Sequence, residues 1–302
     1  MLNKPLKPML LQPSPDVIDK TEWYHSLKWD GFRVLIHYDN GKCRAFTRHG
    51  NEITSSFYPE LSRIKLPIRN AILDGEAICL DQSTQPPKPC WDDVMTRFHT
   101  KNEYSIKRLA QTMPVHFPVW DVLLIDDKPL LKSSFINRRE ALESIVPTSE
   151  VMSVTPLYQD GKQLFLRAKE LGLEGICSYN GKPGASSYYY LDSRPKDVWV
   201  KTKAYQYAIC QITSIRKKEF GWGLSINGTY VGVLEFPPPS NVTKEFYQVA
   251  KQITRSENKD WIFLDPLLSC KIKFQCYSKK GKLRSPKLEE LYIENVVHSS
   301  VC

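Results

Sequence analysis

The spacing of hydrophobic positions changes several times along the chain, and each spacing predicts a different element. Residues 32–38 (FRVLIHY), 71–80 (AILDGEAICL) and 115–125 (VHFPVWDVLLI) are nearly continuous apolar runs, which are typical of buried β-strands. Residues 136–145 and 162–172 instead place their apolar side chains at helical intervals. Strands and helices are therefore expected to interleave in the first two thirds of the chain.

The pattern of predicted elements changes after residue 203. GKCRAFTRHG (41–50) predicts a hairpin partner for the first strand and DVWVKTK (197–203) alternates like a strand, whereas residues 81–89 read as a surface loop. Beyond residue 203 lie short strand-like segments around Gly and Asn-Gly turns, with one helix-like stretch at 243–253. This pattern predicts two domains, 1–205 and 206–302, the second a small β-barrel.

Charge favours a polyanionic partner. The 302 residues carry a formal net charge of +9, and residues 206–302 hold 14 Lys and Arg against 9 Asp and Glu, a net charge of +5. Nucleic acid is the partner that such a balance most often indicates, and the second domain is the more basic of the two per residue.

Cysteine usage and the amino terminus indicate the cellular compartment. The eight cysteines are scattered, without a CxxC pair or a zinc-finger spacing, which fits a reduced intracellular protein. The apolar start of the chain is broken by prolines, and no apolar run reaches the ~20 residues that a membrane-spanning helix needs. We expect a soluble, cytoplasmic protein.

Lys28, in the segment SLKWDGFR (26–33), is the first candidate for chemistry. A lysine amine is a nucleophile only when it is deprotonated, and burial or neighbouring cations can lower its pKa from ~10.4 toward neutrality. The alternative is a solvated lysine before a β-turn, and the segment alone leaves both interpretations open.

Five further segments decide between these interpretations. Together with KWDGFR they resemble, in order, spacing and strand context, the nucleotidyltransferase signature of ATP-dependent polynucleotide ligases, above all the small bacterial and phage DNA ligases and the ligase module of bacterial end-joining enzymes. The segments are TRHGNEIT (47–54), LDGEAICLD (73–81), FPVWDVLLIDD (117–127), LEGICSYN (173–180) and DVWVKTK (197–203).

The resemblance implies a fold, a reaction and a partner. The fold would be α+β: an ATP-grasp-like nucleotidyltransferase (adenylation) domain of antiparallel sheets with flanking helices at 1–205, followed by a small OB-fold β-barrel that binds DNA at 206–302. The enzyme would be a DNA ligase that uses ATP and Mg²⁺ (or Mn²⁺) to seal nicks in double-stranded DNA during repair, replication or recombination. It would act as a monomer in the bacterial nucleoid or a phage-infected cell, with helper proteins left open.

The same resemblance assigns the catalytic residues. Lys28 would attack the α-phosphorus of ATP, and Asp30 would orient it. Lys201 and Lys203 lie two apart on one predicted strand, so both point to one face, where they would bind the α-phosphate and keep the amine of Lys28 neutral by like-charge repulsion. An exposed basic strand face is the alternative for this pair.

Carboxylates and one aromatic residue complete the resemblance. Glu76 would accept from the ribose hydroxyls, and Asp74, on the same strand face, would support a metal or the nick. Glu174 matches the metal-binding carboxylate, and hard oxygen ligands suit Mg²⁺; a helix-capping or strand-start glutamate is the alternative. Trp120 stands where an aromatic residue stacks on adenine; taken alone it would be assigned to the core.

Phosphate recognition and base recognition are predicted less directly. Arg48 would engage the nick 5′-phosphate or the AMP phosphate, and Arg33 belongs to the same electrostatic set. Ser26 replaces a glutamate that often reads the adenine amino group, so backbone groups around Leu27 would choose the base instead. Arg284, in KGKLRSPKLEELY (280–292), is the candidate for the last ligase motif, against a basic DNA-facing surface as the alternative.

Two other functions remain open. An RNA ligase or a capping-type guanylyltransferase shares the lysine nucleophile and the carboxylates, although the OB-like tail favours a DNA ligase. A non-catalytic nucleic-acid-binding protein of this fold would be expected to have lost Lys28, Glu174 or the pair of strand lysines, and the chain retains all of them.

Overall fold

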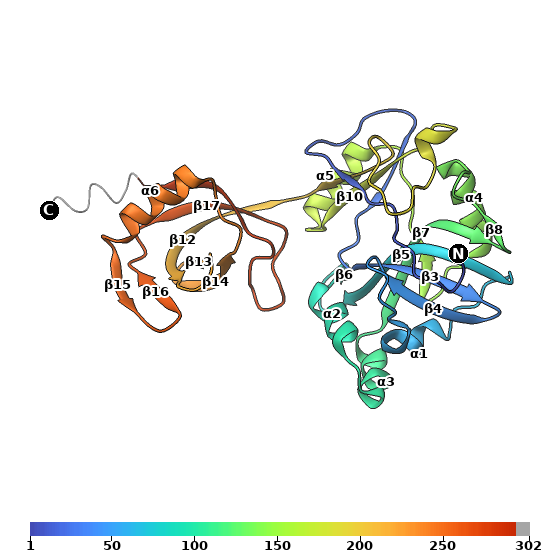
Figure 1. The fold of residues 1–302 in the computed structure, drawn as a ribbon, viewed down its shortest axis with the longest axis horizontal. Coiled ribbons are helices and arrows are strands. Elements are labelled where there is room, and N and C mark those ends of the chain that lie inside the picture. Colours follow the sequence, from blue (N-terminus) through green and yellow to red (C-terminus); the bar gives the residue numbers. More distant parts are fainter. Residues whose placement is uncertain (294–302) are drawn as a thin grey trace. The chain divides into compact units, whose positions relative to one another are not determined.

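The computed structural model describes residues 1–293, and the chain divides into two compact units (Figure 1). The first unit is Met1–Ala204 and the second begins at Tyr205. The predicted second domain, 206–302, ends in residues 294–302, which lie outside the described residues. None of the helices within 1–293 is long and apolar enough to cross a membrane.

Helices cover the sheets of the first unit and one side of the second. Three of them begin where a polar side chain caps the first turn: Asn102, Ser134 and Asp160 each accept a hydrogen bond from the backbone three residues later. The α-helices are α1 (Tyr58–Leu61), α2 (Trp91–His99), α3 (Glu103–Thr112), α4 (Phe135–Ile145), α5 (Gly161–Glu170) and α6 (Ser240–Ala250). Two short 3₁₀ helices lie at Thr54–Phe57 and Ala185–Ser187.

A large sheet forms the centre of the first unit, in the order β4-β3-β5-β7-β8. Its two faces belong to different hydrophobic cores: Val34 and Ile36 on β3 enter one core, while Leu35 between them enters the other. Burial on both faces explains why these strands are continuous apolar runs in the sequence. The strands are β3 (Phe32–Asp39), β4 (Lys42–Thr47), β5 (Asn70–Asp81), β7 (Val115–Ile125) and β8 (Lys128–Pro129), with β6 (Lys88–Pro89) on β5 and β9 (Met152–Val154) on β7.

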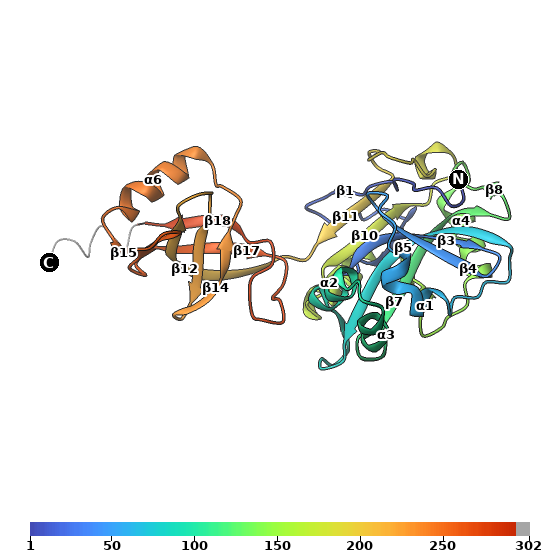
Figure 2. The same ribbon diagram turned by 60° about the horizontal axis from the view of Figure 1, so that its bottom comes forward.

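A smaller sheet, in the order β1-β11-β10-β2, packs against the second face of the large one (Figure 2). Its members are β1 (Gln12–Pro13), β2 (Trp23–Leu27), β10 (Gly175–Asn180) and β11 (Trp199–Lys203). Leu35, Ile72 and Trp120 from the large sheet share one core with Cys177 and Tyr179 from the small one. The candidate site lies at one end of this sheet-on-sheet contact.

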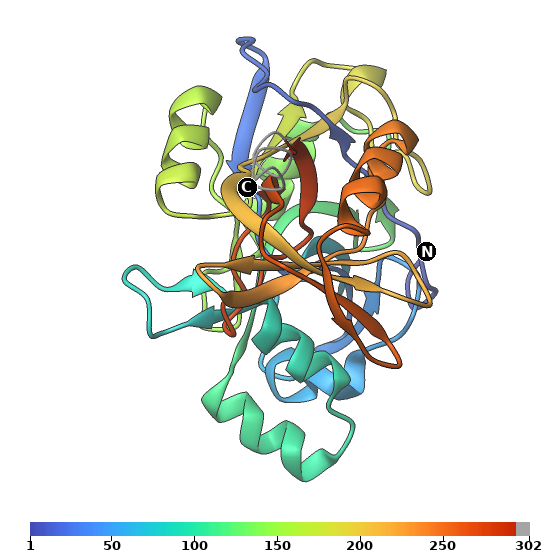
Figure 3. The same cartoon turned by 90° about the vertical axis from the view of Figure 1, so that its left-hand side faces the viewer.

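The second unit is antiparallel β-structure with α6 at one side of its strands (Figure 3). The long strand β12 (Gln206–Arg216) pairs with β17 through its first half and with β13 and β16 through its second half. Trp222 stacks on Phe246 of α6, with ring centroids 3.8 Å apart. The other strands are β13 (Trp222–Ile226), β14 (Thr229–Leu234), β15 (Thr254–Glu257), β16 (Trp261–Leu264), β17 (Ser269–Phe274) and β18 (Lys287–Tyr292).

The elements predicted from hydrophobic spacing are confirmed. The three apolar runs are β3, β5 and β7, and the two helical patterns of the first unit are α4 and α5. The Asn-Gly turn between β13 and β14 has the positive φ angles that such a turn requires, 49° at Asn227 and 76° at Gly228.

Candidate active site

Lys28 is the first residue after β2, at the edge of the small sheet. Its backbone N–H donates to the carbonyl oxygen of Gly175, 2.9 Å away, at the start of β10. Gly175 has a φ of +137°, and a Cβ atom there would lie 2.1 Å from the carbonyl oxygen of Thr202, so glycine is required. This close approach of β2, β10 and β11 brings the preceding residue, Glu174, beside Lys28.

Lys28 and Lys203 share the carboxylate of Glu174. The Nζ of Lys28 lies 2.6 Å from Oε2, and the Nζ of Lys203 lies 3.0 Å from Oε1. The carboxylate is only 6% exposed, whereas the lysine side chains are 19% and 26% exposed. Burial opposes ionisation of Glu174, but the two lysines outweigh it and hold its pKa below the ordinary value. The site is therefore a cation–anion–cation arrangement with its lysines partly open to solvent.

The charge state of Lys28 differs from the expectation. Burial by itself would lower its pKa, but the carboxylates of Glu174 and Glu76 outweigh burial and raise the pKa above the ordinary value. Like-charge repulsion by Lys201 and Lys203 does not leave the amine neutral here, because the nearest charge is a carboxylate rather than another ammonium. The contact with Glu174 therefore favours the protonated form of Lys28.

Lys201 is the lysine whose pKa is lowered. It lies on β11 opposite Cys177, which in turn lies opposite Ser26 on β2, so the three side chains form one row across the sheet. Burial lowers the pKa of Lys201, and the ammonium groups of Lys28 and Lys203 lower it further. The two strand lysines do share a face, as predicted, but only Lys203 reaches the carboxylate of Glu174.

Glu76 adds a second buried carboxylate to the site. It lies on β5 directly opposite Arg33 of β3 and is 8% exposed. Burial raises its pKa to about 8, against the opposing effect of Lys28. A cation or a ligand that brings hydrogen-bond donors would favour the ionised form of this group.

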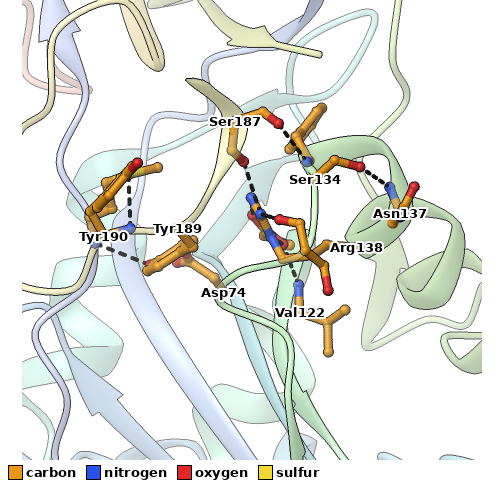
Figure 4. Close-up of polar contacts among 12 residues, drawn as sticks. Asp74, Val122, Ser134, Asn137, Arg138, Ser187, Tyr189 and Tyr190 are labelled. Carbon is orange, nitrogen blue, oxygen red and sulfur yellow. Dashed lines mark hydrogen bonds and ion pairs between the residues drawn. The ribbon is translucent and has the colours of Figure 1, made fainter. Parts of the chain in front are cut away.

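Asp74 and Arg33 bind each other in this structure. Asp74, expected to ligate a metal, is fully buried, and its oxygens accept from the Nε and Nη2 of Arg33 and from the Oη of Tyr189. Figure 4 shows Asp74 beside Tyr189. Arg33, expected to bind the nucleotide, also donates to the carbonyl oxygen of Met9. Each residue is the other's partner across the β3–β5 ladder, and their roles toward the metal and the nucleotide stay predictions.

A metal site made by protein alone is not present within residues 1–293. No group of three or more His, Cys, Asp or Glu side chains gathers there in a metal-binding arrangement. The charges of Glu174 and Glu76 both act on Lys28. Mg²⁺ is commonly bound by one or two carboxylates together with substrate phosphates. These two carboxylates fit such an ion, and Asp74 does not.

Most of the Trp120 side chain lies in the hydrophobic core between the two sheets. It is 8% exposed, contacts the core that Cys177 and Tyr179 share, and its ring centroid is 5.5 Å from the Cζ of Arg33. Its Nε1 is buried without a hydrogen-bond partner among the described residues. The structure places the ring near the site, and its stacking on adenine stays a prediction.

The residues around the nucleophile are positioned by the same sheet. Ser26 is buried, and its hydroxyl is 3.0 Å from the hydroxyl of Tyr179. Leu27 pairs in register with Ile176, and Asp30 is half-buried just after Lys28. Base selection by the backbone at Leu27 and orientation by Asp30 stay predictions.

Of two further predicted arginines, Arg48 lies outside this cluster and Arg284 belongs to the second unit. Arg48 is exposed in the turn after β4, where its Nε is 2.9 Å from the Nε2 of His49. Arg284 belongs to the second unit, between β17 and β18, where its Nη1 is 3.4 Å from the Sγ of Cys276. Their phosphate-binding roles stay predictions.

Tyr189, Met9 and Cys177 are site residues that sequence reasoning missed. Tyr189 stands in a run of three tyrosines that has no distinguishing spacing, and Met9 contributes backbone atoms. For Cys177 a signal existed, because it lies on the same strand face as Gly175, two residues away. Burial raises the pKa of its thiol to about 11.

A family profile described as "ATP dependent DNA ligase domain" matches residues 8–203. The chain belongs to the ATP-dependent DNA ligase family. The predicted family and enzyme class are thereby confirmed, and so is the use of ATP at the level of the family. Apart from residues 47–54, whose Arg48 lies outside the cluster, the segments that carry the resemblance are strands and turns in or beside the Lys28 site.

Relatives and solved structures agree with this family. The chain is 30% identical over 286 residues to the SPbeta prophage-derived DNA ligase-like protein LigB of Bacillus subtilis, covering 94% of this chain and 98% of that protein. It is 29% identical to a DNA ligase of Thermococcus onnurineus over 67% of this chain, but spans only 36% of that protein.

Two solved structures share the fold. Mycobacterial DNA ligase D, complexed with ATP and MES, matches with a TM-score of 0.55 and 22% identity, covering 95% of each chain. A Lig E DNA ligase matches with a TM-score of 0.63 and 16% identity, covering 94% of this chain and 98% of that chain. The fold is therefore that of nucleotidyltransferase ligase domains.

Proposed function

We propose that this enzyme seals 3′-hydroxyl/5′-phosphate nicks in duplex DNA through a lysyl-AMP intermediate on Lys28, in DNA repair, replication or recombination. The observation that carries the proposal is the arrangement at the sheet edge, where Glu174 lies between Lys28 and Lys203 and a second carboxylate, Glu76, faces them. An amine, two flanking cations and two carboxylates are the groups that nucleotidyl transfer from ATP needs.

In the first step the amine of Lys28 attacks the α-phosphorus of ATP. The protonated Lys28 first loses a proton, for which Glu174 Oε2, 2.6 Å away, is the acceptor in contact. The neutral amine then forms the P–N bond as the bond to pyrophosphate breaks, and the nitrogen loses its second proton to solvent. Lys203 and Lys201 then face the phosphates, where their charge stabilises the departing pyrophosphate.

Two further steps complete the joining. The 5′-phosphate of the nick attacks the phosphorus of lysyl-AMP, which releases Lys28 and leaves AMP on the DNA end. The 3′-hydroxyl then attacks the DNA phosphorus, forms the phosphodiester bond and expels AMP. Each step exchanges one bond to phosphorus for another, so positioning and charge neutralisation provide most of the catalysis.

Glu174 and Glu76 would hold a Mg²⁺ or Mn²⁺ ion against the phosphates. Such an ion, when bound, neutralises phosphate charge and orients the leaving group. Once Glu174 has another positive partner, the constraint that now keeps Lys28 protonated weakens.

The second unit is proposed to be an OB-fold-like DNA-binding domain. Its short antiparallel strands with one helix at their side are compatible with that architecture, and residues 206–302 carry a net charge of +5. Contacts to the phosphate backbone would supply affinity without sequence preference.

The decisive experiment is intact-mass analysis after incubation with ATP and Mg²⁺, followed by nicked DNA. We expect the wild type to gain one AMP and to lose it, with joined product, when nicked duplex DNA is added. Lys28→Ala should gain nothing, whereas Lys162→Ala, a matched lysine in an exposed ion pair with Asp19, should behave as the wild type.

Several outcomes would overturn the proposal. Bound AMP is first discharged with pyrophosphate, so a wild type that still gains no AMP is not an adenylyl transferase. An adduct that persists in Lys28→Ala moves the nucleophile elsewhere. An adduct from GTP alone indicates a capping-type enzyme, and discharge onto a nick in RNA but not in DNA indicates an RNA ligase.

A further inference from the structure

Arg33 has two neighbouring carboxylates, Asp74 and Glu76, and of these it donates hydrogen bonds only to Asp74. On the β3–β5 ladder it lies directly opposite Glu76, and Asp74 is two residues earlier on the same face of β5. Yet its Nε and Nη2 both donate to Asp74, while the carboxylate of Glu76 makes no hydrogen bond or ion pair with any residue in 1–293. Glu76 therefore stays available beside Lys28.

Tyr189 is the third member of the Arg33–Asp74 group. Its Oη donates to Oδ2 of Asp74 at 2.7 Å and accepts from Nη2 of Arg33 at 3.2 Å and from the backbone N–H of Met9 at 3.2 Å. The remaining Nη1 of Arg33 donates to the carbonyl oxygen of Met9. The Tyr189 side chain is directed at Asp74 (Figure 4) and is almost fully buried.

The two segments that provide these groups lie outside the large sheet and hold each other. The N–H of Leu10 donates to the carbonyl of Ser193 at 2.8 Å, and the N–H of Asp192 donates to the carbonyl of Lys7 at 2.9 Å. Tyr189 also packs edge-on against Trp199 of β11, with ring centroids 5.3 Å apart. The position of its hydroxyl is thus determined by contacts independent of the Arg33–Asp74 pair.

We propose that Tyr189 is a positioning residue for the nucleotidyl-transfer site: by holding Arg33 on Asp74 it keeps the carboxylate of Glu76 free for the nucleotide and its metal ion. This inference rests on the proposed function of Glu76. Without the hydroxyl, Asp74 loses a donor and Arg33 loses an acceptor, and the guanidinium can turn to Glu76, its register partner. An Arg33–Glu76 pair would occupy the carboxylate that ATP needs.

The test is the ATP dependence of lysyl-AMP formation in the full chain, comparing Tyr189→Phe with Tyr190→Phe. Tyr190 is the neighbouring tyrosine, and its hydroxyl donates to the carbonyl of Ala185, away from the carboxylates. We expect Tyr189→Phe to raise KM for ATP about tenfold, with kcat within about threefold of the wild type, because it removes ground-state binding. Tyr190→Phe should change neither constant.

A purely structural role would give a different result. A less stable protein has fewer active molecules, which lowers the apparent kcat at unchanged KM, and thermal unfolding of both variants measures that loss. If Tyr189→Phe lowers only the apparent kcat, or matches Tyr190→Phe, the inference is wrong. Should Tyr189→Phe fail to fold, Asp74→Asn releases Arg33 from the other side, and it must then raise KM in the same way or the inference falls.

Glu76→Gln separates this inference from the proposed function. A rise in KM for Glu76→Gln without one for Tyr189→Phe overturns the positioning role and leaves the proposed function intact. An unchanged KM for Glu76→Gln removes the proposed role of that carboxylate, and the positioning role with it.

Discussion

Two ionic groups in the first unit each hold a buried carboxylate beside cationic side chains, but they differ in the kind of cation and in how exposed it is. In one, Arg138 of α4 binds Asp121 of β7 through two parallel hydrogen bonds of 2.8 Å, and both side chains are fully buried. The remaining Nη1 donates to the carbonyl oxygens of Ser133 and Ser187 (Figure 4). In the other, Glu174 is contacted by single ammonium groups of Lys28 and Lys203 that are partly exposed.

The difference lies in how easily each group can be separated. A guanidinium fork satisfies a carboxylate with fixed geometry and cannot lose its proton, so the arginine pair is permanent structure. An ammonium is a point charge on a flexible stem that can move, hydrate or deprotonate. The lysine group therefore holds charges that a substrate can rearrange, and the arginine group holds the framework on which they are mounted.

Breaking the arginine pair is expected to have the largest effect on stability. Arg138→Met leaves the carboxylate of Asp121 buried and unpaired, which should lower the free energy of unfolding by about 3–5 kcal/mol. Chemical denaturation at pH 7 measures this loss. The matched control is Arg44→Met, which removes an exposed two-bond pair with Glu52 and should cost less than ~1 kcal/mol. Equal losses in the two variants would contradict the distinction.

Neutralising the carboxylate of the lysine group should act on rate instead of stability. Glu174→Gln is expected to slow lysyl-AMP formation about 100-fold, because it removes the proton acceptor and one proposed metal ligand. The free energy of unfolding should change by less than ~1 kcal/mol, since the partly exposed lysines can be hydrated.

The control for this variant is Glu170→Gln, an exposed glutamate paired with Arg167, which should leave rate and stability unchanged. Time courses of the mass gain and denaturation curves provide both measurements. A variant of Glu174 that reacts normally but unfolds easily would make its contacts a structural pair like that of Arg138.

The extent to which each element is buried explains how much of the fold could be predicted. The strands β3, β5 and β7 were predictable because both faces of the large sheet are buried, which makes their apolar runs continuous. The helices α2 and α3 were not predicted, although Trp91, Val94 and Phe98 of α2 recur at helical intervals, because each is short and buries few apolar side chains, Val94 in one and Ile106 in the other.

Strand alternation predicted which face of a strand the site residues share, but not which side chains bind one another. Strand alternation places Asp74 and Glu76 on one face, but it cannot show that Arg33 of the next strand takes one carboxylate and leaves the other. Tyr189 lies 115 residues from Asp74 in the sequence, and Met9, 24 residues from Arg33, takes part only through its backbone atoms. Such partners depend on tertiary packing.

His37 offers an intermediate case, a buried titratable group with one partner. Its Nδ1 accepts from the backbone N–H of Asn3 at 2.9 Å, so the ring is held neutral, and burial lowers its pKa to about 4, helped by Arg44 and the terminal ammonium and opposed by Glu52. Because the folded protein binds this proton more weakly than the unfolded chain, its contribution to stability is complete above pH 6.5 and is lost as pH falls toward 4.

Between pH 7 and pH 5 the loss attributable to His37 should be about 2 kcal/mol. His37→Asn keeps an acceptor for the N–H of Asn3 but cannot titrate, so its free energy of unfolding should fall less than that of the wild type over this interval. His49→Asn, at an exposed histidine, should keep the wild-type slope. The variant is compared with the wild type at each pH, so titrations common to both cancel. Parallel curves for His37→Asn and the wild type would show that the ring is protonated as readily in the folded as in the unfolded state, which the single hydrogen bond and complete burial of His37 do not allow.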